Sequence, residues 1–320
     1  MNNQNYAYPI ETLSPADFDE WVEHCGSVFG ISTEYFRRHF VNDPHKDYNS
    51  VFIIKSEEGR IISTVRVFHR QVYIGGKIYK MGGIGEVSTN INYRRLGLSY
   101  KLLAAATDYM LKNDFALSML GTGYYSHYEK HGFMKAFSYG KDVSDKLEVG
   151  RDAIAELRSA RAPFSSDIRP LSAENFHDMA MLYNKYCVNL NCCIVRTKEY
   201  WQSWCAGEIK NPHGLFRDGK LVGYICFNGN SVTEIVADER DHDLLLSVIK
   251  SDGGKIQIPA FVKTERKFMD TDFMSIKMIC VYTPIDIEID GKSTVLPDTA
   301  SVVEYLNDNG GFVFWDQDGF

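Results

Sequence analysis

The sequence has 320 residues, a length that suits two domains of about 100–200 residues each. It contains 44% apolar and 24% charged residues. It has no apolar run of the roughly 18–20 residues that cross a membrane and no signal-peptide pattern, so we expect a cytoplasmic protein. Its 35 basic and 42 acidic residues leave a net charge of −7, which disfavours duplex nucleic acid as a partner.

The first half of the chain predicts alternating helices and strands. Ser14 and Pro15 suit the cap and first position of a helix. We expect strands at 51–54, 61–74 and 78–89, with a Gly75-Gly76 turn between the last two. A helix with one apolar face is expected at about 99–112, then a strand at 116–120 and a short helix that ends at His131-Gly132.

The second half repeats this order faintly. Residues 146–168 lie in a region rich in Asp, Arg and Ser and are expected to connect two domains. We expect helices at 174–188, 196–207 and 242–250, a hairpin at 214–227 and a strand at 232–237. The pattern predicts an α/β (α+β) protein with domains at 1–145 and 169–285, followed by a tail at 286–320.

Seven cysteines raise the question of a metal site. Their number is odd, no Cys-x-x-Cys pair occurs, and no pair of histidines follows at zinc-finger spacing. We therefore expect reduced cysteines packed as small apolar residues, and no metal.

The segment from Glu86 to Ser99 has the pattern of an anion site. A strand ends near Thr89, and a loop with Arg94, Arg95 and Gly97 leads into the predicted helix. Backbone N–H groups at a helix start bind anions, glycine permits close approach, and arginine adds charge, so the loop suits a pyrophosphate. A polar loop that only caps a surface helix is the alternative.

A second motif about 30 residues further on gives this loop a context. Arg94-Arg-Leu-Gly97-Leu-Ser99 resembles the pyrophosphate loop of the GCN5-related N-acetyltransferase (GNAT) superfamily, with Ser99 in place of its usual last small residue. Tyr128-Glu-Lys-His-Gly132-Phe133 resembles the Tyr-x-x-x-Gly-Phe motif of the same superfamily, and the order strand, loop, helix, strand, short helix also agrees.

The resemblance implies two GNAT-like acyl-CoA N-acyltransferase domains, with mixed central sheets flanked by helices. It implies an N-acetyltransferase in which a primary amine of a small molecule or peptide attacks the thioester of acetyl-CoA directly. Tyr128 would protonate the departing thiolate, unless it only packs against the sheet. The backbone of Val87, Ser88 and Thr89 would bind the pantetheine arm, and Arg94, Arg95, Leu96, Gly97, Leu98 and Ser99 would bind the pyrophosphate.

Three other ionisable groups are weighed beside Tyr128. Glu86 lies one position off the strand face that lines the thioester, unless a bulge turns it, and is a candidate to bind the acceptor or take its proton. His127 and His131 titrate in a suitable range but are better explained as surface residues.

The layout of the whole chain resembles the enhanced-intracellular-survival (Eis) type of GNAT protein. The motif occurs only in the first domain, so the second is expected to lack cofactor and to shape the acceptor cleft. The residues after Pro284 are too few for the sterol-carrier-like domain of that type. Chains of that type end in an aromatic residue whose terminal carboxylate serves as base in the active site. Phe320 matches this ending, so the resemblance implies that the tail docks toward Tyr128.

Two other functions stay open at this point. The alternatives to an N-acetyltransferase are an acyl-CoA-binding sensor without catalysis and a transferase on the same fold that uses another acyl donor. The first would bind acyl-CoA without turnover, and the second would use acetyl-CoA poorly. Acetyl-CoA and an amine are the expected partners, without nucleic acid or membrane. The identity of the amine and the number of subunits are left open.

Overall fold

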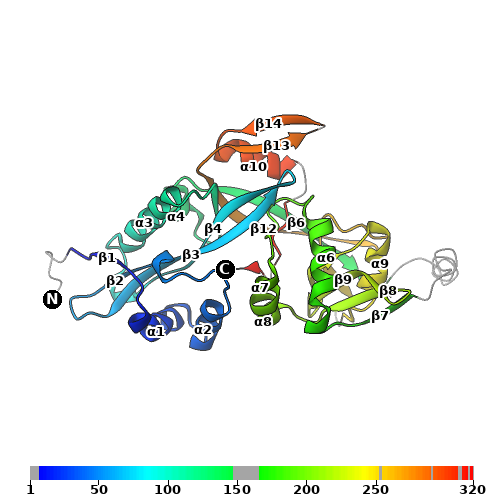
Figure 1. Cartoon of the computed structure of the whole chain (residues 1–320), viewed down its shortest axis with the longest axis horizontal. Coiled ribbons are helices and arrows are strands. Elements are labelled where there is room, and N and C mark those ends of the chain that lie inside the picture. The colour runs from blue at the N-terminus through cyan, green and yellow to red at the C-terminus, as the bar shows by residue number, and fades with distance from the viewer. Residues whose placement is uncertain are drawn as a thin grey trace.

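A twelve-stranded mixed sheet runs through the molecule in the computed structural model, with helices on both of its faces (Figure 1). The structure describes residues 7–146, 166–251, 254–289, 291–308, 312–315 and 318–319. The strand order is β1-β2-β3-β4-β5-β12-β6-β11-β10-β9-β8-β7, and β13 and β14 form a separate hairpin. A mixed sheet flanked by helices confirms the predicted fold class.

The strands of the first half, together with β12 of the second half, have these bounds: β1 (Ile10–Thr12), β2 (Val51–Lys55), β3 (Ile61–Ile74), β4 (Lys77–Thr89), β5 (Leu117–Gly121), β6 (Met134–Ser144) and β12 (Phe268–Val281). The remaining strands are β7 (Ser166–Pro170), β8 (His213–Arg217), β9 (Lys220–Asn228), β10 (Ser231–Val236), β11 (Lys255–Pro259), β13 (Ile285–Ile289) and β14 (Lys292–Leu296).

The helices are α1 (Phe18–Phe29), α2 (Thr33–Val41), α3 (Leu98–Lys112), α4 (Tyr125–Glu129), α6 (Phe176–Cys187), α7 (Lys198–Tyr200), α8 (Ala206–Glu208), α9 (His242–Leu246) and α10 (Thr299–Asp308). A π turn over Trp201–Cys205 joins α7 to α8. Short 3-10 turns cover Pro15–Asp17, Tyr48–Ser50, Ile91–Tyr93, Ala173–Asn175 and Glu239–Asp241.

Most predicted elements agree with the structure. β3 has the predicted bounds, and α3 begins one residue before its predicted start. The Ser14 side chain caps the turn that opens at Pro15, as expected. One helix was predicted too long: α9 ends at Leu246 rather than at 250, and the chain continues in turns closed by hydrogen bonds between backbone groups three residues apart.

The two halves of the chain share strands. β12 lies between β5 and β6 and is antiparallel to both, so a segment from the second half completes the sheet of the first half. β6 continues in turn into the second half, where it pairs with β11. The predicted connector at 146–168 lies between the two halves of the sequence, but in the folded protein a single sheet contains strands of both halves. Residues 147–165 lie outside the described residues.

Helices on opposite faces of this sheet bury the core of the first half. α3 covers one face, with Leu102, Leu103, Ala106 and Met110 buried against the strands. α1 and α2 cover the other face, where a separate hydrophobic cluster includes the buried side chain of Trp21. All seven cysteines are buried and free. Within the described ranges, no helix is long and apolar enough to cross a membrane.

Candidate active site

The strands β4 and β5 separate in the middle of the sheet. They pair in parallel from Met81 to Gly83 on one strand and from Leu117 to Met119 on the other. β4 then continues to Thr89 and β5 to Gly121. The diverging ends form the two sides of a pocket.

A β-bulge on β4 lies at this opening. Gly85 is opposite Arg66 and Ser88 is opposite Thr64, so the two residues between them on β4 face one residue of β3. The first of the two is Glu86, whose φ of +55° is left-handed. A bulge changes the direction in which a side chain points. The bulge on which the Glu86 prediction depended is therefore present, and Glu86 lines the pocket.

The pocket has a volume of about 380 Å³. One wall comes from the turn between α1 and α2, and the others come from the ends of β4 and β5 and from α4. Fifteen residues line it: Phe29, Ile31, Tyr35, Phe36, His39, Phe68, Ile84, Gly85, Glu86, Val87, Gly121, Thr122, Gly123, Tyr124 and Tyr128.

Tyr128 lies on α4 and is only 8% exposed. Burial raises the pKa of its phenol to about 12, and a hydrogen bond with the Thr122 side chain opposes that rise. The phenol is therefore protonated at neutral pH and has a proton to donate. Its ring meets the ring of Phe133 edge-on at 6.2 Å, so the residue also packs in the core.

Glu86 is the carboxylic acid of the pocket, and it is buried. Its Oε1 lies 3.4 Å from an Arg66 nitrogen, whereas its Oε2 is buried and has no hydrogen-bond partner among the described residues. Burial raises the pKa of Glu86 to about 7, although the positive charge of Arg66 opposes the rise. A carboxyl group with such a pKa can take and release a proton near neutral pH.

A buried chain of charges leads away from Glu86. Arg66 also binds Asp43 at 2.9 Å, and Asp43 accepts a second hydrogen bond from Arg70 at 3.0 Å. The opposite side of the Arg70 guanidinium has no hydrogen-bond partner among the described residues and lies 4.9 Å from the Trp204 ring. An aromatic face stabilises a cation of this kind.

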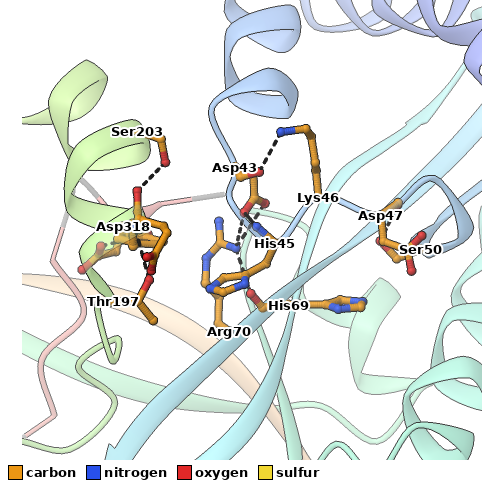
Figure 2. Close-up of polar contacts among 12 residues, drawn as sticks. Asp43, His45, Lys46, Asp47, Ser50, His69, Arg70, Thr197, Ser203 and Asp318 are labelled. Atoms are coloured by element: carbon orange, nitrogen blue, oxygen red, sulfur yellow. Dashed lines mark hydrogen bonds and ion pairs between the residues drawn. The ribbon is translucent and has the colours of Figure 1, made fainter.

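Figure 2 shows Asp43 bound to Arg70 in the first half and Asp318 in the second half, whose negative charge acts on Arg70. The Tyr200 ring lies 5.2 Å from the Arg70 guanidinium, and its hydroxyl donates to Asp318 at 3.1 Å. Asp318 pairs with Arg196 at 2.7 Å, and Arg196 pairs with Glu234. Asp318 thus joins the charged cluster of the second half, and Phe312, also near the chain end, accepts a hydrogen bond from Ser138 of the first half at 3.2 Å. The described tail residues Phe312, Val313 and Trp315 are buried, whereas Phe320 lies outside the described residues.

The loop before α3 enters the helix through a left-handed glycine. Gly97 caps α3 with a φ of +75°, and a Cβ built on it would meet open space. Within the described residues, no side chain caps this helix start. Arg94 donates from Nε to the Thr89 carbonyl at 3.2 Å, which holds the loop against the end of β4. Two other residues of the loop differ in exposure: Leu96 is 43% exposed and Leu98 is buried. The backbone of Arg95 is left-handed, with a φ of +66°.

Of the remaining predicted residues, Val87 lines the pocket, whereas the side chains of Ser88, Thr89 and Ser99 contact neighbouring side chains. Val87 lines the pocket beside Glu86, but Ser88 is buried and its hydroxyl lies 3.0 Å from His24. Thr89 bonds through its hydroxyl to Ser63. Ser99 lies 3.4 Å from His127, so this histidine bridges α3 and α4 instead of lining the pocket.

The sequence analysis missed the residues that support Glu86. Arg66 and Arg70 stand four positions apart in β3 and so share one face of a strand that is buried along most of its length. Two charges on the buried face of such a strand are a signal that a buried acid lies nearby. No pattern in the sequence predicted that the turn between α1 and α2 would form a wall of the pocket. No group of three or more His, Cys, Asp or Glu in the described part of the chain is placed to hold a metal ion.

The first part of the chain matches a known protein domain. A model of the acetyltransferase (GNAT) domain matches residues 9–136. These residues form a GNAT domain. No curated protein sequence matches the chain significantly.

Solved structures extend the likeness beyond that domain. A GCN5-related N-acetyltransferase from Kribbella flavida has a TM-score of 0.67 at 14% identity, over 90% of this chain and 83% of its own. One from Anabaena variabilis has 0.66 at 13%, over 90% and 85%. Eis1 from Mycobacterium abscessus has 0.59 at 12%, over 84% and 72%. Identities this low show the fold alone. The chain thus has an Eis-like tandem GNAT fold, as predicted, and its GNAT domain supports an acyl-CoA-dependent acyltransferase.

Proposed function

We propose that the protein is an acetyl-CoA-dependent N-acetyltransferase that acts on a primary amine. The observation that carries the proposal is the pocket at the separated ends of β4 and β5. It holds a protonated phenol, Tyr128, and a buried carboxyl group with a pKa of about 7, Glu86. An acid and a base with separate environments are what transfer between an amine and a thioester requires.

The loop before α3 fits the pyrophosphate of acetyl-CoA. α3 is a 15-residue helix, and the N–H groups of its first turn form a positive end where an anion is stabilised. The open space at Gly97 leaves room for phosphate oxygens, and Arg94 and Arg95 supply positive charge. We assign the pyrophosphate to Arg94–Ser99 and the pantetheine arm to the strand end at Val87.

The residues of the pocket then divide the proton transfers. Acetyl-CoA supplies the thioester. Glu86 takes a proton from the acceptor ammonium, which frees the nitrogen lone pair to form the new C–N bond. Tyr128 donates its proton as the C–S bond breaks, so the leaving group departs as a thiol. The nitrogen of the new C–N bond still carries one extra proton, which passes to the Tyr128 phenolate, and the proton on Glu86 leaves to water, so both groups are restored.

A pH profile of the Glu86→Gln variant tests this role. In the native enzyme Glu86 must be ionised to accept a proton, so we expect kcat/KM to rise with pH through about 7. Glutamine has the same shape without the titration, so this limb should disappear in Glu86→Gln. The readout is thiol release at saturating acetyl-CoA from pH 5.5 to 9. An unchanged limb would remove Glu86 from the role of base.

The same profile bears on the predicted role of Phe320. If a terminal carboxylate took the proton instead, Glu86→Gln would keep its activity, and a variant without Phe320 would lose it. A protein that binds acetyl-CoA but releases no thiol with any amine would be the acyl-CoA sensor that the sequence left open.

The Gly97→Asp substitution tests the loop. We expect the dissociation constant of acetyl-CoA to rise at least about tenfold, or about 1.4 kcal/mol, because a carboxylate would lie beside the pyrophosphate. The positive φ of Gly97 adds strain for any side chain, so Gly97→Asn is the matched control with the same shape and no charge. Calorimetric titration measures both. Equal affinities for the two variants would contradict the assignment.

A further inference from the structure

The walls of the pocket restrict the acceptor more than its catalytic groups do. Six aromatic residues line it, and the aliphatic residues Ile31, Ile84 and Val87 add to the apolar surface. Glu86 is the one carboxylic acid among the fifteen lining residues. The pocket thus combines a single acidic position with a largely apolar lining.

The turn between α1 and α2 and the residues on either side of it form an apolar wall of the pocket. Phe29 is the last residue of α1, and its ring lies 5.6 Å from that of Phe36. Tyr35 lies 5.2 Å from Phe36 and 3.9 Å from His39, so the rings form one continuous surface. Gly30 has a φ of +67° and reverses the chain so that both helices contribute.

This wall extends to the surface. Phe29 is 43% exposed, Ile31 46% and Tyr124 81%. Exposed apolar groups that gather at a pocket, rather than singly, mark a binding site. His39 in this wall is buried, and its Nε2 lies 3.4 Å from Glu208 of the second half without a hydrogen bond to any described residue.

The lining of the pocket offers one carboxyl group, Glu86, that can bind an ammonium group of a ligand. The Oε2 atom of Glu86 is buried without a partner in the described part of the chain, so it can accept one hydrogen bond from a ligand. A second or third ammonium on the same ligand would have aromatic faces to contact but no second carboxylate in the lining to balance its charge. Removing a charge from water without such a partner is costly.

Resting on the proposed function, we infer that the acceptor is a monoamine with a small aromatic or branched aliphatic body, rather than a polyamine or a polar amine. The ammonium binds Glu86, and the body packs on Phe29, Ile31 and Tyr35. Each apolar group placed there leaves water, and a pocket of about 380 Å³ suits a small ligand.

A panel of three amines tests the inference. Phenethylamine has one ammonium and an apolar body, ethanolamine has one ammonium without that body, and spermidine has three charges. We expect kcat/KM for phenethylamine to exceed that for each of the others by at least about tenfold. An equal or higher value for spermidine or ethanolamine would overturn the inference and leave the N-acetyltransferase proposal standing. Bound acetyl-CoA without acetylation of any amine would instead refute the proposed function.

The Phe29→Ala variant ties the preference to the wall. We expect it to lower the ratio of kcat/KM between phenethylamine and ethanolamine about tenfold. Val41→Ala is the matched control, because Val41 is an exposed apolar residue of α2 outside the pocket, and it should leave the ratio unchanged. If Phe29→Ala changes the preference between hexanoyl-CoA and acetyl-CoA but not the amine ratio, the wall binds the acyl chain and the inference is wrong.

Discussion

In the Tyr128→Phe variant we expect kcat to fall at least about 100-fold, with little change in KM for either substrate. The hydroxyl acts only when the thiolate departs, so its loss removes an interaction of the transition state and leaves ground-state binding intact. The ring stays in place, and its packing against Phe133 should preserve the fold. Steady-state kinetics and the melting temperature measure the two effects.

Tyr125→Phe is the matched control for this prediction. Tyr125 lies on the same helix, α4, one turn before Tyr128, and it does not line the pocket. Its ring faces Lys135, with the ammonium 4.4 Å from the ring centre, and phenylalanine retains this contact. We expect native kcat from this control. Native turnover in Tyr128→Phe would transfer the acid role to water.

The Arg196→Ala variant should lose about 3–5 kcal/mol of unfolding free energy. Arg196 is fully buried and pairs with two carboxylates, Glu234 at 2.5 Å and Asp318 at 2.7 Å. Alanine would leave two buried carboxylates that repel each other without a counter-charge. The guanidinium also lies 4.1 Å from the Tyr183 ring, and this contact would be lost as well. Urea unfolding followed by tryptophan fluorescence gives the difference.

An exposed arginine provides the comparison. Arg240 pairs with Asp238 at 3.2 Å, but its side chain is 65% exposed. Exposed pairs contribute little, so Arg240→Ala should change the unfolding free energy by less than about 1 kcal/mol. If Arg196→Ala does not accumulate as folded protein, Asp318→Asn keeps the shape and removes one charge, and it should still be less stable than the native chain. Native stability in both variants would contradict the prediction.

Local sequence patterns predicted the elements that place the site. A segment rich in β-branched and aromatic residues marked β3, and apolar residues three and four apart marked α3. Gly97 and Tyr128 were identified because their motifs are short and contiguous. The direction of Glu86 was left conditional, because a bulge depends on which residues of the neighbouring strand oppose it.

Contacts between segments that lie far apart in the chain could not be predicted from the sequence. Arg196 and Asp318 are separated by 122 positions, and Asp43 and Arg70 by 27, so no periodicity relates them. The insertion of β12 between β5 and β6 was equally hidden, because any apolar strand of suitable length satisfies the pattern.

The sequence by itself determined the family resemblance, most of the helices and strands, and the two short motifs, at Arg94–Ser99 and at Tyr128, on which the resemblance depends. Helix periodicity, turn residues and caps depend on interactions over a few residues, and the chain carries these wherever it folds. Only the tertiary structure decided that Glu86 turns into the pocket, that Arg66 and Asp43 support it, and that the α1–α2 turn forms the apolar wall. Burial and pairing across strands set these features, because the free energy of a buried charge depends on every group packed around it.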